Sequence, residues 1–500
     1  MSSEFLLLDT NGWTWIAIIA LLVIGGYFFL DKLMRKGIYE EGRMSGGMMG
    51  RAGSALSELQ TLVAPAQRNV IEERQERKRA EHDDAGDDPA PTKYLFKVKQ
   101  HVRIAIRLLP VYHSSAMKIW FALFLLLSSV SFAQSHSSAA QSDETQQLLQ
   151  SLADAPGPSG FEEPVRKIMV EHMKPLAEKL SYDGLGSVIA VQGSSGPRIM
   201  VDAHMDELGG VIRRVTNDGY LTMQMLGGWL DQALVDQRWT IIGSKGPVRA
   251  ITGIRDVHIV PQEERGKVYP REWIFLDVGA KNAAEVAAMG LEPGDPVAPD
   301  APFAVMNGTQ NYLGKGWDDR VGCAVVIEAM KRLAHLPHPN QIFWVATVQE
   351  ELGVRGAHTS SDIVKPEIGI AIEGGVTRDA PRVGPEEAQE VLGGGPAIFL
   401  YDSSELPNRK LVSLFKQTAK EKSIPLQTDL IQGYGDDSAE IQKSNGGAPT
   451  ANLVVPVRYT HSHNGIMNRG DFDKMVDLLV AVLQKLDAKA VANLRDFIPE

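Results

Sequence analysis

The sequence predicts an α/β protein with a small β-barrel inserted into its main domain. On both sides of residues 213–305, apolar runs rich in β-branched residues alternate with amphipathic helical segments, which is typical of a sheet covered by helices. Within residues 213–305, short β-rich runs alternate with Gly and Pro turns, which is typical of a barrel. The 500 residues are too many for one compact core and indicate two or three units.

Composition excludes several classes of protein. The net charge of −11 and the absence of a basic stripe argue against a general nucleic-acid binder. A single cysteine, Cys323, excludes an internal disulfide framework and a zinc cluster built on cysteines. Its apolar neighbours predict that Cys323 is a buried thiol of the core rather than a catalytic one.

Residues 1–116 are expected to hold a transmembrane segment followed by a charged linker. The apolar run 13–30 has eighteen residues, which would span roughly 27 Å as a helix, about the thickness of a bilayer core. Basic residues follow this run, which favours a cytoplasmic C-terminal side. Residues 71–92 are charge-dense and end in Asp and Pro, which is typical of a disordered or loosely helical linker.

Residues 117–133 have the pattern of a secretory signal peptide, with a basic start, an apolar middle and small residues before a cut after Ala133. Such signals normally begin a protein, so two interpretations stay open. Either Met117 is the true start and residues 1–116 are a mis-joined or fused membrane protein, or the run is a second transmembrane helix. We favour the first. Both predict an extracytoplasmic protein, periplasmic or secreted, with membrane contact only through these N-terminal segments.

Residues 134–212 begin the main domain. Helices are predicted at 144–152 and 162–180, and strands at 187–191 and 198–202. The second strand leads into His204 and Asp206. A histidine at a strand end can coordinate a metal while a nearby carboxylate fixes its ring orientation. A lone His in such a place is more often structural, so this motif alone is weak evidence.

Residues 213–305 form the predicted barrel. Strands are expected at 220–225, 239–242, 248–254 and 273–278, with one short helix at 283–289. No cluster of candidate ligands falls in this segment. We therefore expect the barrel to serve assembly and to shape access to the site.

Residues 306–500 resume the α/β pattern. Strands are predicted at 342–348, 368–372 and 450–459, and helices at 321–333 and 472–486. Glu350 and Glu351 follow the first strand, and two adjacent carboxylates leaving a buried strand are costly unless a cation receives them. Because neighbouring side chains diverge, one Glu can coordinate a metal while the other serves as general base. A solvated helix start is the plainer interpretation of this pair on its own.

Six side chains lie at predicted strand ends or at a strand-to-helix transition: His204, Asp318, Glu350, Glu351, Glu373 and His461. In an open α/β sheet, ligands and catalytic groups collect at the carboxyl ends of the strands. Two histidines and several carboxylates are the ligand set of two divalent ions that share one bridging carboxylate. Paired Asp at a helix start often only caps the helix, but that interpretation leaves the other five side chains unexplained.

Five motifs in order resemble the dinuclear aminopeptidase family that includes the tetrahedral (TET) and glutamyl aminopeptidases, some members of which carry a mistaken cellulase label. They are His204-Met205-Asp206-Glu207, Asp318-Asp319-Arg320, Gln349-Glu350-Glu351-Leu352-Gly353, Arg355-Gly356-Ala357 and Val457-Arg458-Tyr459-Thr460-His461-Ser462. The resemblance covers about residues 145–486. It implies a three-layer, phosphorylase/hydrolase-like core of the zinc-exopeptidase kind, formed by 134–212 and 306–500. It also implies that barrel 213–305 supports dimers and often dodecamers.

The resemblance also implies roles for single residues. Asp318 would bridge two divalent ions, Zn²⁺ or Co²⁺, with a cis peptide to Asp319. His204 and Glu373 would complete one site, and Glu351 and His461 the other. Glu350 would be the general base, and Asp206 would orient His204. The chain departs from the family at Glu373, where Asp is usual, at His463, where Pro is common, and in residues 435–438.

The resulting hypothesis is a metal-dependent aminopeptidase that removes N-terminal residues from short peptides. Two alternatives stay open: a related exopeptidase or deacylase acting on N-acyl or C-terminal substrates, which Glu373 mildly supports, and a non-catalytic metal- or peptide-binding relative. Glycoside hydrolysis is excluded, since adjacent Glu350 and Glu351 cannot flank a sugar bond from opposite sides.

Overall fold

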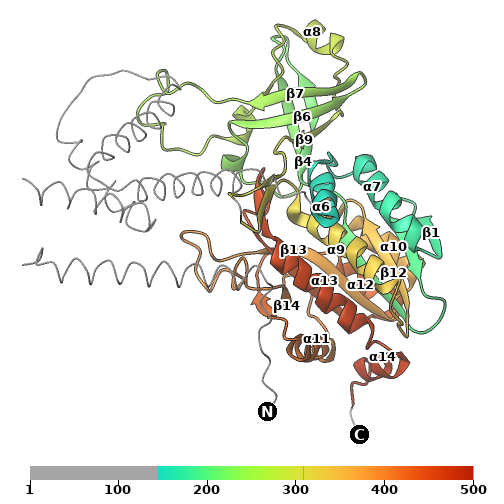
Figure 1. Ribbon diagram of the computed structural model, residues 1–500. Coiled ribbons are helices and arrows are strands. Elements are labelled where there is room, and N and C mark those ends of the chain that lie inside the picture. Colours follow the sequence, from blue (N-terminus) through green and yellow to red (C-terminus); the bar gives the residue numbers. More distant parts are fainter. Residues whose placement is uncertain (1–142, 308, 499–500) are drawn as a thin grey trace, which may run out of the picture. The chain divides into compact units, whose positions relative to one another are not determined.

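The computed structural model describes residues 143–498 apart from residue 308 (Figure 1). The segments predicted from residues 1–116 and 117–133, including the apolar run 13–30, lie outside these described residues. Within the described part of the chain, no helix combines the length and the apolar character needed to cross a membrane.

An eleven-stranded sheet forms the centre of the main domain. Its order is β1 (Lys179–Tyr182), β2 (Val188–Gln192), β12 (Gln341–Thr347), β3 (Arg198–His204), β13 (Ile368–Val376), β16 (Thr450–Arg458), β17 (Gly465–Asn468), β11 (Asn311–Gly314) and β10 (Ala304–Val305), with β14 (Ala397–Tyr401) and β15 (Gln427–Leu430) branching from β16. The four central strands β12, β3, β13 and β16 are parallel. Their carboxyl ends therefore meet at one edge of the sheet.

The central strands are buried on both faces, which explains why their sequences are continuous apolar runs. Along β3, Ile199 and Val201 belong to one hydrophobic cluster, whereas Met200 between them belongs to another. The same alternation separates Trp344 from Val345 on β12. Because successive strand residues point to opposite faces, the two clusters lie on opposite sides of the sheet.

Helices cover both faces of the sheet (Figure 1). They are α6 (Glu144–Asp154), α7 (Glu163–Met173), α9 (Trp317–Leu333), α10 (Arg355–Val364), α11 (Arg409–Glu421), α12 (Ser438–Lys443), α13 (Arg469–Leu483) and α14 (Ala488–Leu494). Helices α6, α7, α9 and α13 contribute to the larger cluster, and α10 and α12 to the smaller one. The α/β class predicted from the sequence is confirmed.

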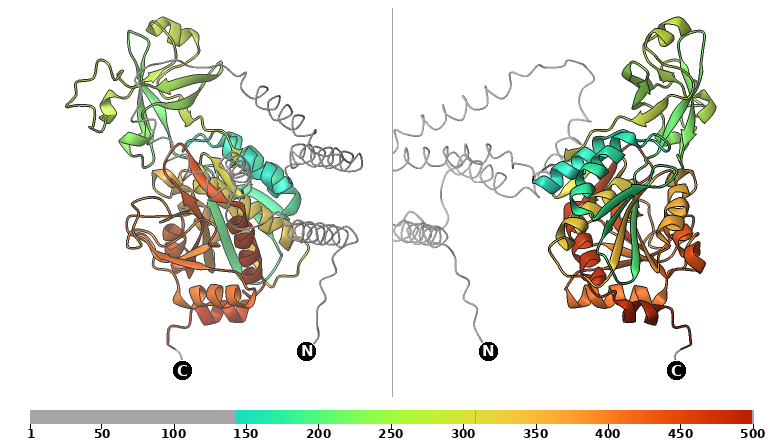
Figure 2. Two further views of the ribbon diagram at one scale, coloured as in Figure 1. Left: turned by 60° about the vertical axis from the view of Figure 1, so that its left-hand side comes forward. Right: turned by 90° about the vertical axis from the view of Figure 1, so that its right-hand side faces the viewer.

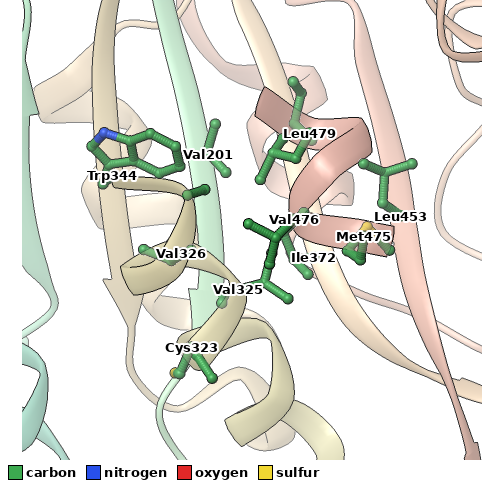
Figure 3. Packing of buried hydrophobic residues seen from close by; sticks show 14 of the residues in the cluster. Val201, Cys323, Val325, Val326, Trp344, Ile372, Leu453, Met475, Val476 and Leu479 are labelled. Carbon is green, nitrogen blue, oxygen red and sulfur yellow. The ribbon is translucent and has the colours of Figure 1, made fainter. Parts of the chain in front are cut away.

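Figure 3 shows how α9 and α13 pack on the sheet. Val325 and Val326 of α9 and Val476 of α13 lie against strand residues that include Trp344, and all of them are fully buried. Cys323 belongs to the same core, and its Sγ lies 3.2 Å from the carbonyl oxygen of His204. Burial raises the pKa of this thiol. Cys323 is thus a core residue, as the sequence predicts.

The insert is a closed barrel of six strands and appears as the green, β-rich part of the chain (Figures 1 and 2). Its order is β4 (Gly209–Val215), β5 (Leu221–Leu226), β8 (Leu276–Asp277), β7 (Gly246–Thr252), β6 (Gln237–Gly243) and β9 (Pro296–Pro299), with the short helix α8 (Ala283–Ala288) beside them. Trp239, Ile241 and Leu276 lie in a core separate from that of the sheet. The predicted barrel is confirmed.

Three predicted boundaries need correction. The predicted boundary at 212/213 falls inside β4, because the pair Gly209-Gly210 lacks the β-branched signal of a strand start. The predicted helix 162–180 stops at Met173, and Pro175 follows in a short 3₁₀ turn, since proline breaks a helix interior. The predicted strand 273–278 shortens to Leu276–Asp277.

Strand β13 extends to Val376, so Glu373 lies within the strand rather than after it. The strand continues through Gly374, where a Cβ atom would stand 3.2 Å from the Cα of Asp318. Glycine at this position therefore lets β13 approach the turn that carries Asp318.

Candidate active site

The predicted site residues come together at the carboxyl edge of the parallel strands. His204 ends β3, and in the neighbouring strand β12 its partner in register is Thr347, three residues before Glu350. Glu373 lies on β13, next to β3. His461 follows β16 in a loop, and Asp318 lies in the first turn of α9. The peptide between Asp318 and Asp319 is cis.

Three side chains form a first group of possible metal ligands: His204, Asp318 and Glu373. The Nε2 atom of His204 lies 3.1 Å from Oδ1 of Asp318 and 3.5 Å from Oε2 of Glu373. His204 and Glu373 are almost fully buried. One imidazole and two carboxylates are a donor set that suits Zn²⁺ or Co²⁺.

A second group shares Asp318 with the first and adds Glu351 and His461. The Nε2 atom of His461 lies 3.2 Å from Oδ2 of Asp318 and 3.7 Å from Oε1 of Glu351. Each oxygen of Asp318 therefore faces a different histidine. This is the arrangement that a carboxylate bridging two cations requires.

Electrostatics supports the fit of this donor set to cations. Burial raises the pKa of Glu373 and Glu350 well above the usual range, and raises the pKa of Glu351 to about 7. The Oε1 atom of Glu351 is buried without a hydrogen-bond partner. Several carboxylates kept out of water at close range are unfavourable as anions unless positive charge is added.

Asp206 connects the end of β3 to the turn that follows β12. Its Oδ1 accepts a hydrogen bond from the backbone N–H of Glu350 at 3.0 Å, and its Oδ2 accepts one from the N–H of Glu351 at 3.2 Å. The hydroxyl of Ser159 donates to the same Oδ2 at 2.7 Å. Nδ1 of His204 lies 3.1 Å from the carbonyl oxygen of Asp206 and 3.5 Å from its Oδ1. Asp206 thus contacts both His204 and the Glu350-Glu351 turn.

Replacing Asp206 with Ala is expected to weaken metal binding by about 10- to 100-fold, because groups that orient ligands contribute about this much. Ser159→Ala, which removes only one of the hydrogen bonds to Asp206, is the matched control and should have a smaller effect. Competition with a chromogenic chelator measures both affinities. Equal affinities in the Asp206→Ala variant and the wild type would contradict this role.

Glu350 borders an open cavity of about 280 Å³. The lining includes members of both ligand groups and a second wall formed by Ser404 and residues 433–436. Glu350 also belongs to a cluster with His204 and Glu351, so it lies beside the first ligand group. A carboxylate in this place can exchange a proton with a molecule bound in the cavity.

The backbone around the site is strained. Gln349, Val354, Tyr459 and His461 all have positive φ values, between 49° and 62°. This conformation is unfavourable for residues with a side chain, above all for a β-branched one such as Val354. Strain of this kind clusters at functional sites, where the surrounding structure maintains it.

Sequence reasoning missed several supporting contacts. Glu207 is buried and forms an ion pair with Lys315 at 2.7 Å, next to Gly316 at the start of α9. The barrel contributes the carbonyl of Gly228, which lies 2.9 Å from Nδ1 of His461. His463 packs against Trp229 and Trp239 of the barrel segment, with ring centroids 5.4 and 4.2 Å away. No sequence motif marks these contacts, since they join residues more than a hundred positions apart.

The α/β fold and the two ligand groups that share Asp318 define the class of protein as a metal-dependent hydrolase. The model of the M42 glutamyl aminopeptidase family matches residues 186–478. The chain therefore belongs to the M42 family of aminopeptidases.

Individual relatives agree with this assignment. The lysyl aminopeptidase of Pyrococcus furiosus is 32% identical over 68% of this chain and 97% of its own length. The glutamyl aminopeptidase of Lactococcus lactis is 30% identical over 70% of this chain and 98% of its own. The protein is accordingly a metal-dependent aminopeptidase, a hydrolase acting on N-terminal residues.

Solved structures give the same result. A TET aminopeptidase from a marine sediment thaumarchaeon has a TM-score of 0.69, with 36% identity over 70% of this chain and 99% of its own. The TET1 peptidase of Pyrococcus horikoshii, which can assemble into a tetrahedron or a large octahedral shell, has a TM-score of 0.63 and 28% identity, covering 69% of this chain and all of its own.

The predicted extracytoplasmic location is wrong. It depended on residues 13–30 and 117–133, which lie outside the described part of the chain. About 70% of this chain accounts for nearly the whole length of the relatives, which leaves the remaining residues without a counterpart there. The prediction depends on apolar runs with flanking basic and small residues, and such patterns alone do not establish where the peptidase resides.

Proposed function

We propose that the protein removes N-terminal residues from short peptides with two divalent ions, Zn²⁺ or Co²⁺, held by five side chains. His204 and Glu373 would hold one ion, Glu351 and His461 the other, and Asp318 both. The observation that supports this most strongly is the position of Asp318, whose two oxygens face different histidines at 3.1 and 3.2 Å.

Glu350 is the general base in this proposal. Bound divalent ions would polarise the scissile carbonyl and favour ionisation of the attacking water. Glu350 removes the proton from that water and later delivers it to the leaving amine. Asp206 maintains the position of Glu350 through its backbone N–H. The open cavity beside Glu350, about 280 Å³, suits a small molecule or the end of a peptide rather than a folded protein.

The domain organisation is part of the proposal. Residues 134–212 and 306–500 would form the catalytic domain, with the boundary at β4 moved to Gly209. The barrel would support a homo-oligomer, from dimer to dodecamer, as the assembly of the TET1 peptidase supports. The barrel segment also contacts His461 through the carbonyl of Gly228, so it takes part in forming the site.

Metal removal followed by a substrate panel tests this function. We expect a chelator to abolish activity and either Zn²⁺ or Co²⁺ to restore it, since the donor set suits both ions. The restored enzyme should hydrolyse aminoacyl anilides and short peptides with free N-termini. Preferential hydrolysis of N-acyl amino acids or of C-terminal residues would instead support a deacylase or carboxypeptidase. Metal binding without any hydrolysis would indicate a binding protein.

A further inference from the structure

A third group of carboxylates shares no residue with the two ligand groups and includes Asp436 of the cavity wall. It consists of Asp402, Glu405 and Asp436, and one carboxylate oxygen of each lies within 4.8 Å of the other two. At most 2% of each residue is exposed. Asp402 and Glu405 follow β14, and Asp436 precedes α12, so the group connects two loops.

Several oxygens of this group have no hydrogen-bond partner. Oδ1 of Asp402 accepts hydrogen bonds from the backbone N–H groups of Ser404 and Glu405, but its Oδ2 accepts none. Both carboxylate oxygens of Glu405 are buried and also unpartnered. Within the described residues, no Lys, Arg or His forms an ion pair with the three carboxylates. A buried carboxylate without hydrogen bonds or a counter-charge is unfavourable.

Neutral oxygens complete the surroundings. The amide of Asn452 is fully buried, donates through Nδ2 to Oδ2 of Asp436 at 2.6 Å, and leaves its own Oδ1 without a partner. The buried hydroxyl of Ser438 lies close to the carboxylates of Glu405 and Asp436 and acts to lower their pKa, but forms no hydrogen bond of good geometry. Ser438 is not acidic, and its fully buried hydroxyl is unpartnered beside two of the carboxylates, so it is evidence for a missing positive group that is independent of the acidic residues.

The donor chemistry selects the class of ligand. Every available atom is an oxygen, and the described residues of the group include no His nitrogen or Cys sulfur. Hard cations such as Ca²⁺ and Mg²⁺ bind carboxylate, amide and hydroxyl oxygens, whereas Zn²⁺ sites normally include nitrogen or sulfur. We propose that Asp402, Glu405 and Asp436, with the hydroxyl of Ser438, bind a hard divalent cation of the Ca²⁺ or Mg²⁺ class.

The same geometry has a simpler explanation, in which the carboxylates share protons instead of binding a cation. Burial raises the pKa of Glu405 to about 7, and raises that of Asp436 well above its usual range. In the absence of a cation, the group therefore retains protons near neutral pH. A bound cation would displace those protons and fix the loops of Ser404 and Asp436, both of which line the cavity.

Metal titration of the full chain tests the proposal without reference to catalysis. The protein is first stripped of metal and saturated with Zn²⁺, and is then titrated with Ca²⁺, Mg²⁺ and, as a luminescent Ca²⁺ substitute, Tb³⁺. We expect one further equivalent of Ca²⁺ or Mg²⁺ and a rise of a few degrees in Tm at saturation. Wild-type protein that takes up no further equivalent and shows no change in Tm would overturn the proposal, even if the Zn²⁺ sites fill normally.

Glu405→Gln is the informative variant, and Glu390→Gln is its matched control. Glu390 is likewise fully buried with both oxygens unpartnered, but belongs to no ligand group. We expect Glu405→Gln to weaken the affinity for the additional cation by at least about tenfold, because it removes a ligand. Glu390→Gln should leave this affinity unchanged. Both variants should retain the Zn²⁺ content of the wild type. Equal cation affinity in the wild type and Glu405→Gln, with a higher Tm of this variant at alkaline pH, would establish the shared-proton network instead.

Discussion

Glu350→Gln is expected to lower kcat/KM by about 10²- to 10⁴-fold while leaving the metal content unchanged, because general base catalysis contributes about this much. The side chain lies beside His204 and Glu351 but is not one of the five proposed ligands of the metal pair. Gln has nearly the same shape as Glu, and the variant retains the backbone N–H that donates a hydrogen bond to Asp206. The variant therefore isolates the loss of a proton acceptor.

Glu351→Gln is the natural comparison, since it changes the neighbouring residue in the same way. Glu351 lies 3.7 Å from His461 and belongs to the second ligand group. The Glu351→Gln variant should lose both the ion bound at that group and its activity. Metal analysis by mass spectrometry and steady-state kinetics on an aminoacyl anilide measure both effects. Near-normal turnover in Glu350→Gln, or loss of metal from it, would refute the role of general base.

Asp318→Ala is expected to remove both catalytic ions and, with them, all measurable activity. Its two oxygens face His204 and His461 separately, so this one side chain belongs to both ligand groups. Removing one shared ligand from a two-metal centre affects both ions, since the bridging carboxylate also offsets their mutual repulsion. Titration of the stripped variant with Zn²⁺ should detect no tight site.

Two further variants provide the contrast. His461→Ala should lose only the ion of the second group, because the first group does not include His461. Asp319→Asn is the matched control, since Asp319 is an adjacent buried carboxylate that accepts the backbone N–H of Gly322 and belongs to no ligand group. It should bind both ions. If Asp318→Ala retained one tight ion, Asp318 would be a ligand of one site rather than a bridge.

Much of the main domain could be predicted from local pattern. The apolar runs that became β3, β12, β13 and β16 are buried on both faces, and such runs have few alternatives to a central strand. The helix before β1 was predicted too long because amphipathic spacing continues past Pro175, where the backbone cannot. The barrel strand β4 was missed because its start is two glycines.

The candidate ligands were predictable because each of them is near a strand end or a helix start. Their roles stay predictions that the variants above test. The supporting contacts were not predictable in the same way. Asp206 was expected to orient His204, but its two hydrogen bonds to the Glu350-Glu351 turn depend on β3 and β12 being neighbours. The cluster of Asp402, Glu405 and Asp436 is not predictable from the sequence, because Asp436 is distant from the other two in the chain and all three belong to loops.

The sequence by itself determined the α/β class, the inserted barrel and the family, because periodic burial and short motifs are properties of consecutive residues. Only the tertiary structure decided which oxygen faces which histidine, and which buried carboxylates lack a counter-charge. The physical reason is that electrostatic energy in a buried site depends on separations of a few ångströms. The short distances from Asp318 to His204 and to His461 arise only when the sheet and its loops have assembled.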